Sequence, residues 1–268
     1  AMDRLEDIAN EEEIRNIWGH LGEDFFLRHT TDEISGISRE LLEHDPEAGP
    51  FVSMSPVDLT YLGEGATQIY ILAEDKPQTF AAIVVCLTQW ELSVVDAHIN
   101  KAVNGRIFNT FTVLNADGAP LDQDERLRGE VIEKVKETLM SPSPRTNAAT
   151  RRVPRQLREL SRPTEVTMET DAEGLSTRLH ILAADRPGLL ANISLLLIDL
   201  KLELSSARIT TLGERVEDVF IVTDANGETI RDKATLYDLE NALRQKLDQS
   251  MDSKQSNLSI FGGSKIKA

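Results

Sequence analysis

The sequence predicts an α+β fold of two ferredoxin-like units. Each unit is an antiparallel four-stranded sheet with two helices, and a short helical segment precedes the pair. Three observations predict this fold. A stretch from Ile71 to Gly118 is repeated from Ile181 to Gly227, with an offset of 110 residues between Ile71 and Ile181. Within each copy, β-rich runs alternate with runs of helical periodicity. Each copy also has a spare β-rich run in front of it.

The repeat is clearest at the first strand of each copy and at the turn that follows it. Residues 71–77 read ILAEDKP and align with residues 181–187, which read ILAADRP. The same offset holds for about thirty residues, and after a one-residue slip residues 115–118 (NADG) align with residues 224–227 (DANG). An internal repeat of this length indicates two copies of one structural unit.

The elements of each unit follow from the periodicity of their apolar residues. In each copy a short strand gives way to an amphipathic helix, because an Asp-Lys/Arg-Pro turn supplies a possible N-cap, Asp75 or Asp185, and a proline suited to the first helical turn. A hairpin and a second amphipathic helix complete the unit. The predicted strands are 68–73, 94–101 and 107–114 in copy one and 178–183, 204–211 and 216–223 in copy two, and the predicted second helices are 125–139 and 234–247.

A fourth strand is missing after the second helix, where a ferredoxin-like unit normally has it. The spare runs that begin at Phe51 and Glu165 are rich in β-forming residues, and we expect each to pair with the adjacent first strand. Both units are therefore predicted to be permuted, with an initial strand in place of the last.

These features divide the chain into five segments. Residues 49–140 and 164–250 are the two units, and residues 141–163 are a Pro- and Arg-rich linker that we expect to be solvated. Residues 251–268 form a polar tail that we expect to be flexible. Residues 1–48 are helical, with Thr30 and Glu33 as a possible capping box. Since this segment is too short to hold a core of its own, we expect the end of a preceding domain or a lever.

Composition excludes several classes of function. The formal net charge is −16 and the isoelectric point is about 4.8, which disfavours binding to nucleic acid because phosphates are recognised mainly by Lys and Arg. The longest apolar stretch, near 189–200, is shorter than the roughly 20 residues of a membrane span. A single cysteine, Cys86, cannot form an internal disulfide, so a cytoplasmic location is expected. Cys86 lies on the apolar side of a predicted helix, and we expect a core residue.

Four stretches carry a resemblance to a known family. The Asp-Lys/Arg-Pro units resemble ACT domains, which are small-molecule sensing modules, and the whole chain resembles the C-terminal end of the bifunctional uridylyltransferase/uridylyl-removing enzymes. The stretches are 17–19 with 26–29, 92–97, 109–114 and 207–218, and the last, ARITTLGERVED, is the most specific. This resemblance covers nearly the whole chain.

The resemblance implies a regulatory role without catalysis. The family's transferase site has a Gly-Ser turn before an Asp-x-Asp pair, and the one Asp-x-Asp, at residues 122–124, lacks that turn. His44-Asp45 resembles part of the family's hydrolase metal site, but a metal needs several converging ligands, so we expect no metal here. Both catalytic domains, with their magnesium, are expected upstream of this chain. The implied effector is glutamine, and the implied partners are the upstream domains, the PII signal protein and a possible second copy of the chain.

Local chemistry places the predicted ligand site at the strand-to-helix turn of copy two. Backbone N–H groups at a helix N-terminus suit a ligand carboxylate, Gly188 lets a ligand approach closely, and Asp185 is a candidate partner for an α-ammonium group. In an ACT-like unit the start of the following strand faces the same crevice. The candidate residues are Asp185, Arg186, Pro187, Gly188, Leu189, Glu203 and Leu204. The alternative is that Asp185 is an ordinary helix cap and Gly188 a packing residue.

Copy one departs from this pattern. Gln78 replaces the glycine, which we expect to leave less room for a ligand to approach the backbone. Asp75, Lys76 and Ser93 keep polar groups at corresponding places. We therefore expect copy two to be the better sensor. A competing hypothesis from another class is that the repeats form a protein-interaction or dimerisation module that has lost ligand binding, most plausibly in copy one.

Overall fold

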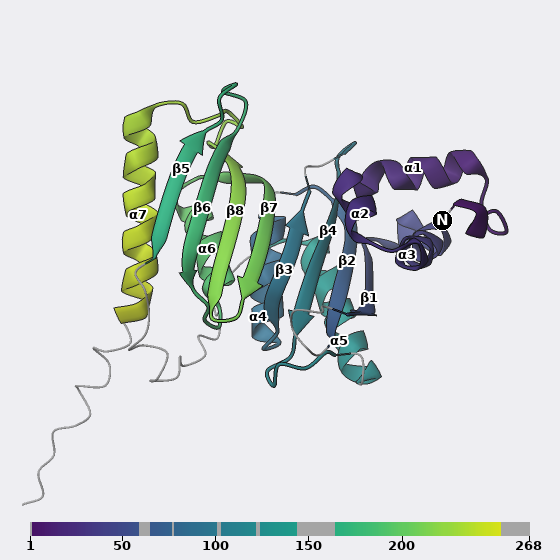
Figure 1. Ribbon diagram of the computed structural model, residues 1–268. Coiled ribbons are helices and arrows are strands. Elements are labelled where there is room, and N and C mark those ends of the chain that lie inside the picture. Colours follow the sequence, from purple (N-terminus) through teal and green to yellow (C-terminus); the bar gives the residue numbers. More distant parts are fainter. Residues whose placement is uncertain are drawn as a thin grey trace, which may run out of the picture.

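The computed structural model describes residues 2–58, 65–76, 78–100, 103–121, 124–143 and 164–252 (Figure 1). The predicted linker falls mostly outside these residues, as does the predicted tail from residue 253 onward. The N-terminal part contains helices α1 (Glu11–Leu21), α2 (Glu23–Arg28) and α3 (Thr31–Glu43), with short 3-10 turns at Met2–Arg4 and Pro46–Ala48.

Two units of the same ββαββα order follow. The first contains β1 (Phe51–Val57), β2 (Ala66–Glu74), α4 (Thr79–Gln89), β3 (Ser93–Ile99), β4 (Arg106–Leu114) and α5 (Glu125–Met140). The second contains β5 (Glu165–Thr170), β6 (Thr177–Ala184), α6 (Leu189–Asp199), β7 (Glu203–Leu212), β8 (Arg215–Thr223) and α7 (Lys233–Asp252). The predicted elements are present, and α7 extends beyond its expected end.

The permuted strand order is confirmed. Strand β1 pairs antiparallel with β2, with Phe51 opposite Leu72, and β5 pairs in the same way with β6, with Glu165 opposite Leu182. The spare runs therefore fill the place of the missing fourth strand in both units.

One difference from expectation is that the two sheets are joined. Strands β3 and β7 pair antiparallel and create a single eight-stranded sheet in the order β1-β2-β4-β3-β7-β8-β6-β5 (Figure 1). His98 lies opposite Arg208, and the repeat offset maps one of these residues onto the other, so the units are related by a pseudo-twofold axis at this pair. The pairing satisfies backbone N–H and C=O groups that would otherwise be unpaired at two sheet edges.

One continuous core lies between the sheet and its helices. Helices α5, α4, α6 and α7 succeed one another across one face, each packing against the next. Every residue of α4 from Thr79 to Leu87 is buried, since α4 contacts the sheet and both neighbouring helices. Phe80 contacts Phe111 of its own unit and Phe220 of the other, with ring centroids 6.5 and 6.4 Å apart. The two units therefore share their hydrophobic core.

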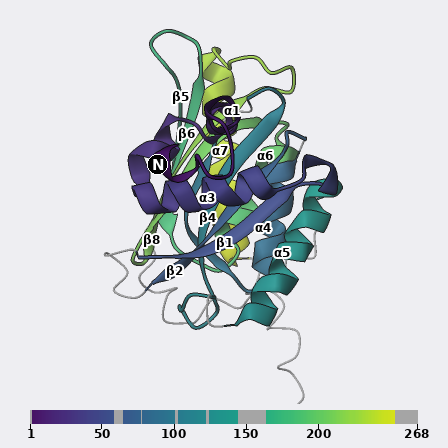
Figure 2. The ribbon, with the colours of Figure 1, turned by 90° about the vertical axis from the view of Figure 1, so that its right-hand side faces the viewer.

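Helices α1–α3 cover the opposite face of the first unit. Phe25 of α2 is only 1% exposed and packs against Tyr70 and Phe108 of the sheet. Figure 2 looks from the β1 end of the sheet and shows α5 on one side, while α3 crosses in front of the strands. Buried residues of the segment form one cluster with Phe51, Tyr70, Leu72 and Phe108 of the sheet. Its place on the sheet was not foreseen.

The sequence explains why helices α1–α3 pack on the first unit and not on the second. Tyr70 and Phe108 correspond by the repeat to the polar residues His180 and Glu217 of the second unit, where the Nε2 of His180 lies 3.5 Å from the Glu217 carboxylate. The apolar face of the first unit requires burial, whereas the charged face of the second unit is stable in water.

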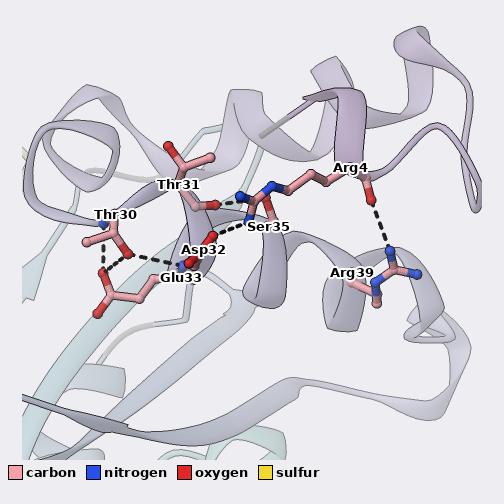
Figure 3. A network of polar contacts seen from close by, with 7 residues as sticks. All are labelled: Arg4, Thr30, Thr31, Asp32, Glu33, Ser35 and Arg39. Atoms are coloured by element: carbon pink, nitrogen blue, oxygen red, sulfur yellow. Dashed lines mark hydrogen bonds and ion pairs between the residues drawn. The ribbon is translucent and has the colours of Figure 1, made fainter.

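Polar contacts fix the N-terminal helices internally (Figure 3). The predicted capping box at Thr30 and Glu33 is present, and Asn10 and Glu13 form a second one. The guanidinium of Arg39 donates to the carbonyl of Arg4 at 2.9 Å, and the guanidinium of Arg4 contacts Asp32. These contacts attach the first turn of the chain to α3.

Replacing Phe25 with Ala should lower the free energy of unfolding by about 3–5 kcal/mol, because the substitution leaves a cavity between α2 and the sheet. Leu27 of the same helix is 82% exposed, so Leu27→Ala should change the free energy by less than about 0.5 kcal/mol. Urea denaturation of both variants measures the effect. Equal effects would show that α2 does not pack on the sheet.

Candidate ligand-binding cavities between the two units

The strand-to-helix turns are built alike in the two units. The N–H of Asp185 donates to the carbonyl of Glu214 at 2.8 Å, and the N–H of Asp75 donates to that of Gly105 at 2.9 Å. Each bond anchors its turn to the hairpin of the same unit. Gly188 then adopts a left-handed backbone with φ of +77°, and α6 begins at the next residue.

The expectation that Asp75 and Asp185 could cap helices is wrong. Gln78 and Gly188 occupy the N-cap positions, and neither helix has a side-chain capping hydrogen bond. The helices begin four residues after the aspartates, because the left-handed residue redirects the chain first. The carboxylates are thus not used as caps.

A cavity of about 350 Å³ opens at the turn of the second unit, and we call it the Asp185 cavity. All five predicted turn residues line it: Asp185, Arg186, Pro187, Gly188 and Leu189. Its other wall comes from the first unit, where Thr88, Glu91 and Ser93 mark the end of α4 and the start of β3. A Cβ atom at Gly188 would lie 3.7 Å from the methyl group of Thr88, so the two walls approach closely there.

A second cavity, of about 980 Å³, lies at the turn of the first unit, and we call it the Asp75 cavity. The predicted residues Asp75, Lys76 and Gln78 line it. The facing wall comes from the second unit and includes Glu203 and Leu204 at the start of β7.

The structure therefore corrects how the predicted residues are grouped. We expected Glu203 and Leu204 to face the same crevice as Asp185, but they line the Asp75 cavity, and Ser93 lines the Asp185 cavity. The cause is the antiparallel β3–β7 pairing, which sets the turn of each unit against the helix end of the other. Each cavity is consequently shared between the units.

The Asp185 cavity is acidic, and its two aspartates are largely buried. Burial raises the pKa of the Asp185 carboxyl above its usual value. Burial also raises the pKa of Asp218 to about 7, with the charge of Asp185 adding to the effect and a backbone hydrogen bond at Thr210 opposing it. Asp218 is 1% exposed, and its Oδ1 has no hydrogen-bond partner among the described residues. Two carboxyl groups in one apolar cavity favour a bound cation or proton.

The charged end of the Arg186 side chain contacts helix α7. Its guanidinium donates to the carbonyl of Leu247 near the end of α7 at 3.0 Å. Burial lowers the pKa of Arg186, and the nearby Asp248 opposes that effect. The guanidinium of Arg186 is thus held by α7, while a backbone hydrogen bond at Arg186 partly opposes the raised pKa of Asp185.

Asp218 is not among the residues that the sequence pattern predicted for the site. Strand β8 alternates, and Asp218 falls on the inward face between Val216 and Phe220, both buried. An acid among apolar inward residues is a signal in the sequence itself, since buried charges are rare without a partner. In the first unit the corresponding residue is Asn109, which is 1% exposed, lines the Asp75 cavity and has an Nδ2 without a partner among the described residues.

Two other candidate residues have structural roles. The Nε2 of His44 lies 3.0 Å from the carbonyl of Gly49. Cys86 is buried and free, and burial raises the pKa of its thiol. Across the described ranges, no three His, Cys, Asp or Glu side chains gather as a metal site would require. No helix within those ranges is long and apolar enough to cross a bilayer.

Comparison with known proteins gives two family matches. Residues 174–250 match the model of the ACR family N-terminal ACT domain, and residues 1–36 match that of the uridylyltransferase GlnD fifth domain. Among solved structures, aspartate kinase from Synechocystis aligns with 70% of this chain and 27% of its own, at 12% identity and a TM-score of 0.38.

Curated relatives match over nearly the whole chain. The bifunctional uridylyltransferase/uridylyl-removing enzyme of Stutzerimonas stutzeri (strain A1501) is 36% identical over 252 residues, which is 94% of this chain and 28% of the relative. The enzyme of the same name from Azotobacter vinelandii (strain DJ) is 37% identical over 239 residues, which is 89% of this chain and 26% of the relative. The chain thus spans about a quarter of the length of these relatives.

The left-handed residues of the two turns predict opposite effects of substitution. Gly188→Ala should lower the free energy of unfolding by about 1 kcal/mol, because an L side chain is strained at this φ even though Thr88 leaves room for the Cβ. Gln78, with φ of +66°, already bears that strain, so Gln78→Gly should raise the free energy by up to about 1 kcal/mol. Thermal or urea denaturation measures both, and the same sign for both would contradict the shared turn geometry.

The buried Asp218 predicts a pH dependence of stability. Its folded pKa of about 7 exceeds the unfolded value of about 4, so its contribution to stability is fully present below about pH 4 and is lost as pH rises through about 7. Asp218→Asn should therefore stabilise the protein at pH 8 relative to pH 5, by about 2–3 kcal/mol. Urea denaturation at both pH values tests this, and an unchanged pH dependence in the variant would refute it.

Proposed function

This chain is a tandem ACT region homologous to that of the bifunctional uridylyltransferase/uridylyl-removing enzymes, and on that premise we propose that it binds glutamine and thereby controls catalytic domains outside this chain. The observation that carries the proposal is the Asp185 cavity, which both units line and in which two carboxyl groups meet a helix N-terminus. The proposal places the chain in the cytoplasm.

The cavity has the size and the polar groups that a free amino acid requires. Its volume of about 350 Å³ lies at the small end of the range for ligand pockets. The N-terminus of α6, which no side chain caps, suits the α-carboxylate. Asp185 suits the α-ammonium group, and the glycine at position 188 leaves the backbone accessible.

The charges of the cavity favour glutamine over glutamate. Asp185, Asp218 and Glu91 line the cavity, and Arg186, the one cationic group among its described lining residues, is held against α7. A second ligand carboxylate would meet like charges in a poorly hydrated space, which is unfavourable. A neutral amide would find hydroxyl groups at Thr88 and Ser93 instead.

Regulation follows because the ligand would contact both units at once. A ligand shifts a conformational equilibrium only to the extent that it prefers one arrangement. Bound between the Asp185 turn and the α4 end, glutamine stabilises the arrangement in which these walls are close. In the parent this would bias the balance between uridylylation of PII and its reversal, carried out by magnesium-dependent catalytic domains.

The second candidate function is a protein-interaction or dimerisation module that binds PII or another copy of this chain. The observation favouring it is the outer face of the second unit, where His180 and Glu217 are part-exposed and no described helix covers the strands. Such a module would need neither cavity.

Calorimetry separates the two functions. The proposal predicts saturable heat when glutamine is added to the folded chain, at least tenfold weaker binding of glutamate, and no binding of 2-oxoglutarate, which lacks an ammonium group. Absence of heat with glutamine on well-folded protein would eliminate the sensor function of this chain.

Gly188→Val locates the site in the same assay. A β-branched side chain at Gly188 would fill the approach to the helix, so glutamine affinity should fall at least tenfold. Gly118→Val is the matched control, because Gly118 has a similar φ of +80°, lines neither cavity and has no atom within 4 Å of the place that a Cβ would take. An unchanged affinity in Gly188→Val, or an equal loss in both variants, would place the site elsewhere.

A further inference from the structure

Asp218 is a buried acid that accepts a hydrogen bond from the backbone at Thr210 through one of its carboxylate oxygens only. It lies on the inward side of β8 opposite Ile181 of β6, between the buried residues Val216 and Phe220. Its Oδ1 has no hydrogen-bond partner among the described residues, yet its side chain lines the Asp185 cavity. An apolar residue would pack there at less cost, since burying a polar group without a partner is unfavourable.

Among the residues that the structure describes, the charged groups around Asp218 supply no counter-ion. From the β6–α6 turn, Asp185 adds a second carboxyl, and Arg186 of the same turn donates to the carbonyl of Leu247. From the α4–β3 turn, Glu91 adds a third acid. No lysine lines this cavity among the described residues. The site is therefore complete only when a cation or a proton enters.

We propose that Asp218 and Asp185 together bind the primary ammonium group of the amino-acid ligand, and that a proton occupies the pair when the ligand is absent. This inference rests on the proposed binding of glutamine. It adds Asp218 as the residue that selects for a ligand with an amine. On binding, the O–H bond of the Asp218 carboxyl breaks, its proton passes to solvent, and the ligand's N–H groups donate to the freed carboxylate.

This exchange keeps the charge of the cavity constant. The empty pair carries one negative charge and one proton, and the occupied pair carries two negative charges and one ammonium group. The raised pKa of Asp218, about 7, agrees with a proton held in the empty cavity near neutral pH. A ligand without a basic amine cannot replace that proton.

The first unit offers a natural contrast. Asn109 holds the corresponding position on β4, opposite Ile71 of β2, and an amide neither binds a proton nor pairs with an ammonium group as a carboxylate does. The proposed proton exchange therefore belongs to the Asp185 cavity and not to the Asp75 cavity.

Calorimetry of the whole chain with glutamine in two buffers tests the exchange. Phosphate and Tris differ in their heats of ionisation, so the difference in binding heat at one pH counts the protons released. At pH 7 we expect about half a proton per glutamine, since a group with a pKa of about 7 is half protonated there. The number should fall toward zero at pH 8, where Asp218 is mostly ionised and the ligand amine is still protonated.

Asp218→Asn is the diagnostic variant and Glu217→Gln its matched control. Asp218→Asn should abolish proton release and weaken glutamine binding at least tenfold. Glu217 is the preceding residue of β8 but lies on the exposed outer face, so Glu217→Gln should leave both quantities unchanged. Proton release that persists in Asp218→Asn would overturn the proposal.

A second probe avoids mutation altogether. N-acetylglutamine keeps the carboxylate and the amide but has no ammonium group, and we expect no binding to the unmodified chain. Binding as tight as that of glutamine would overturn the amine selection. Tight glutamine binding with equal heats in both buffers at pH 7 would overturn this inference alone, whereas absence of glutamine binding would remove the proposed function with it.

Discussion

The antiparallel pairing of β3 with β7 is the interaction on which the rest of the structure depends. It turns two four-stranded sheets into one and places α4 beside α6 under a common core. It also relates the two units by the pseudo-twofold axis at the His98–Arg208 pair. The strand-to-helix turn of each unit therefore lies against the helix end of the other unit. Without this pairing the turns would face water, and neither cavity would have a second wall.

Within this symmetric frame the two cavities differ in chemistry. Gly188 and Asp218 in one have Gln78 and Asn109 as counterparts in the other, so the Asp185 cavity holds a second buried acid where the Asp75 cavity holds an amide. The backbone tolerates both versions because Gln78 accepts the same left-handed geometry as the glycine. A repeated fold has thus been kept while the properties of its two sites diverged.

Much of this architecture could be predicted from the sequence. The features that could not be predicted share one physical cause. The repeat, the initial strands and the Thr30 capping box depend on neighbouring residues or on a fixed offset, so they were predicted. Grouping Glu203 with Asp185 failed because it assumed that each unit forms its own site. The burial of Asp218 was missed because alternation identifies the inward face but not the cavity beneath it. Contacts between units depend on which edge strands pair, and no local pattern in the sequence specifies that.

The cover formed by α1–α3 has a mechanical consequence. On β4, Asn109 points toward the Asp75 cavity and its neighbour Phe108 points to the opposite face, where it meets Phe25 of α2. Cavity and N-terminal helices are therefore separated by the thickness of a single strand. A rotation of β4 by a few degrees would move both side chains at once in opposite directions. Strand β4 would thereby couple the Asp75 cavity mechanically to helices α1–α3.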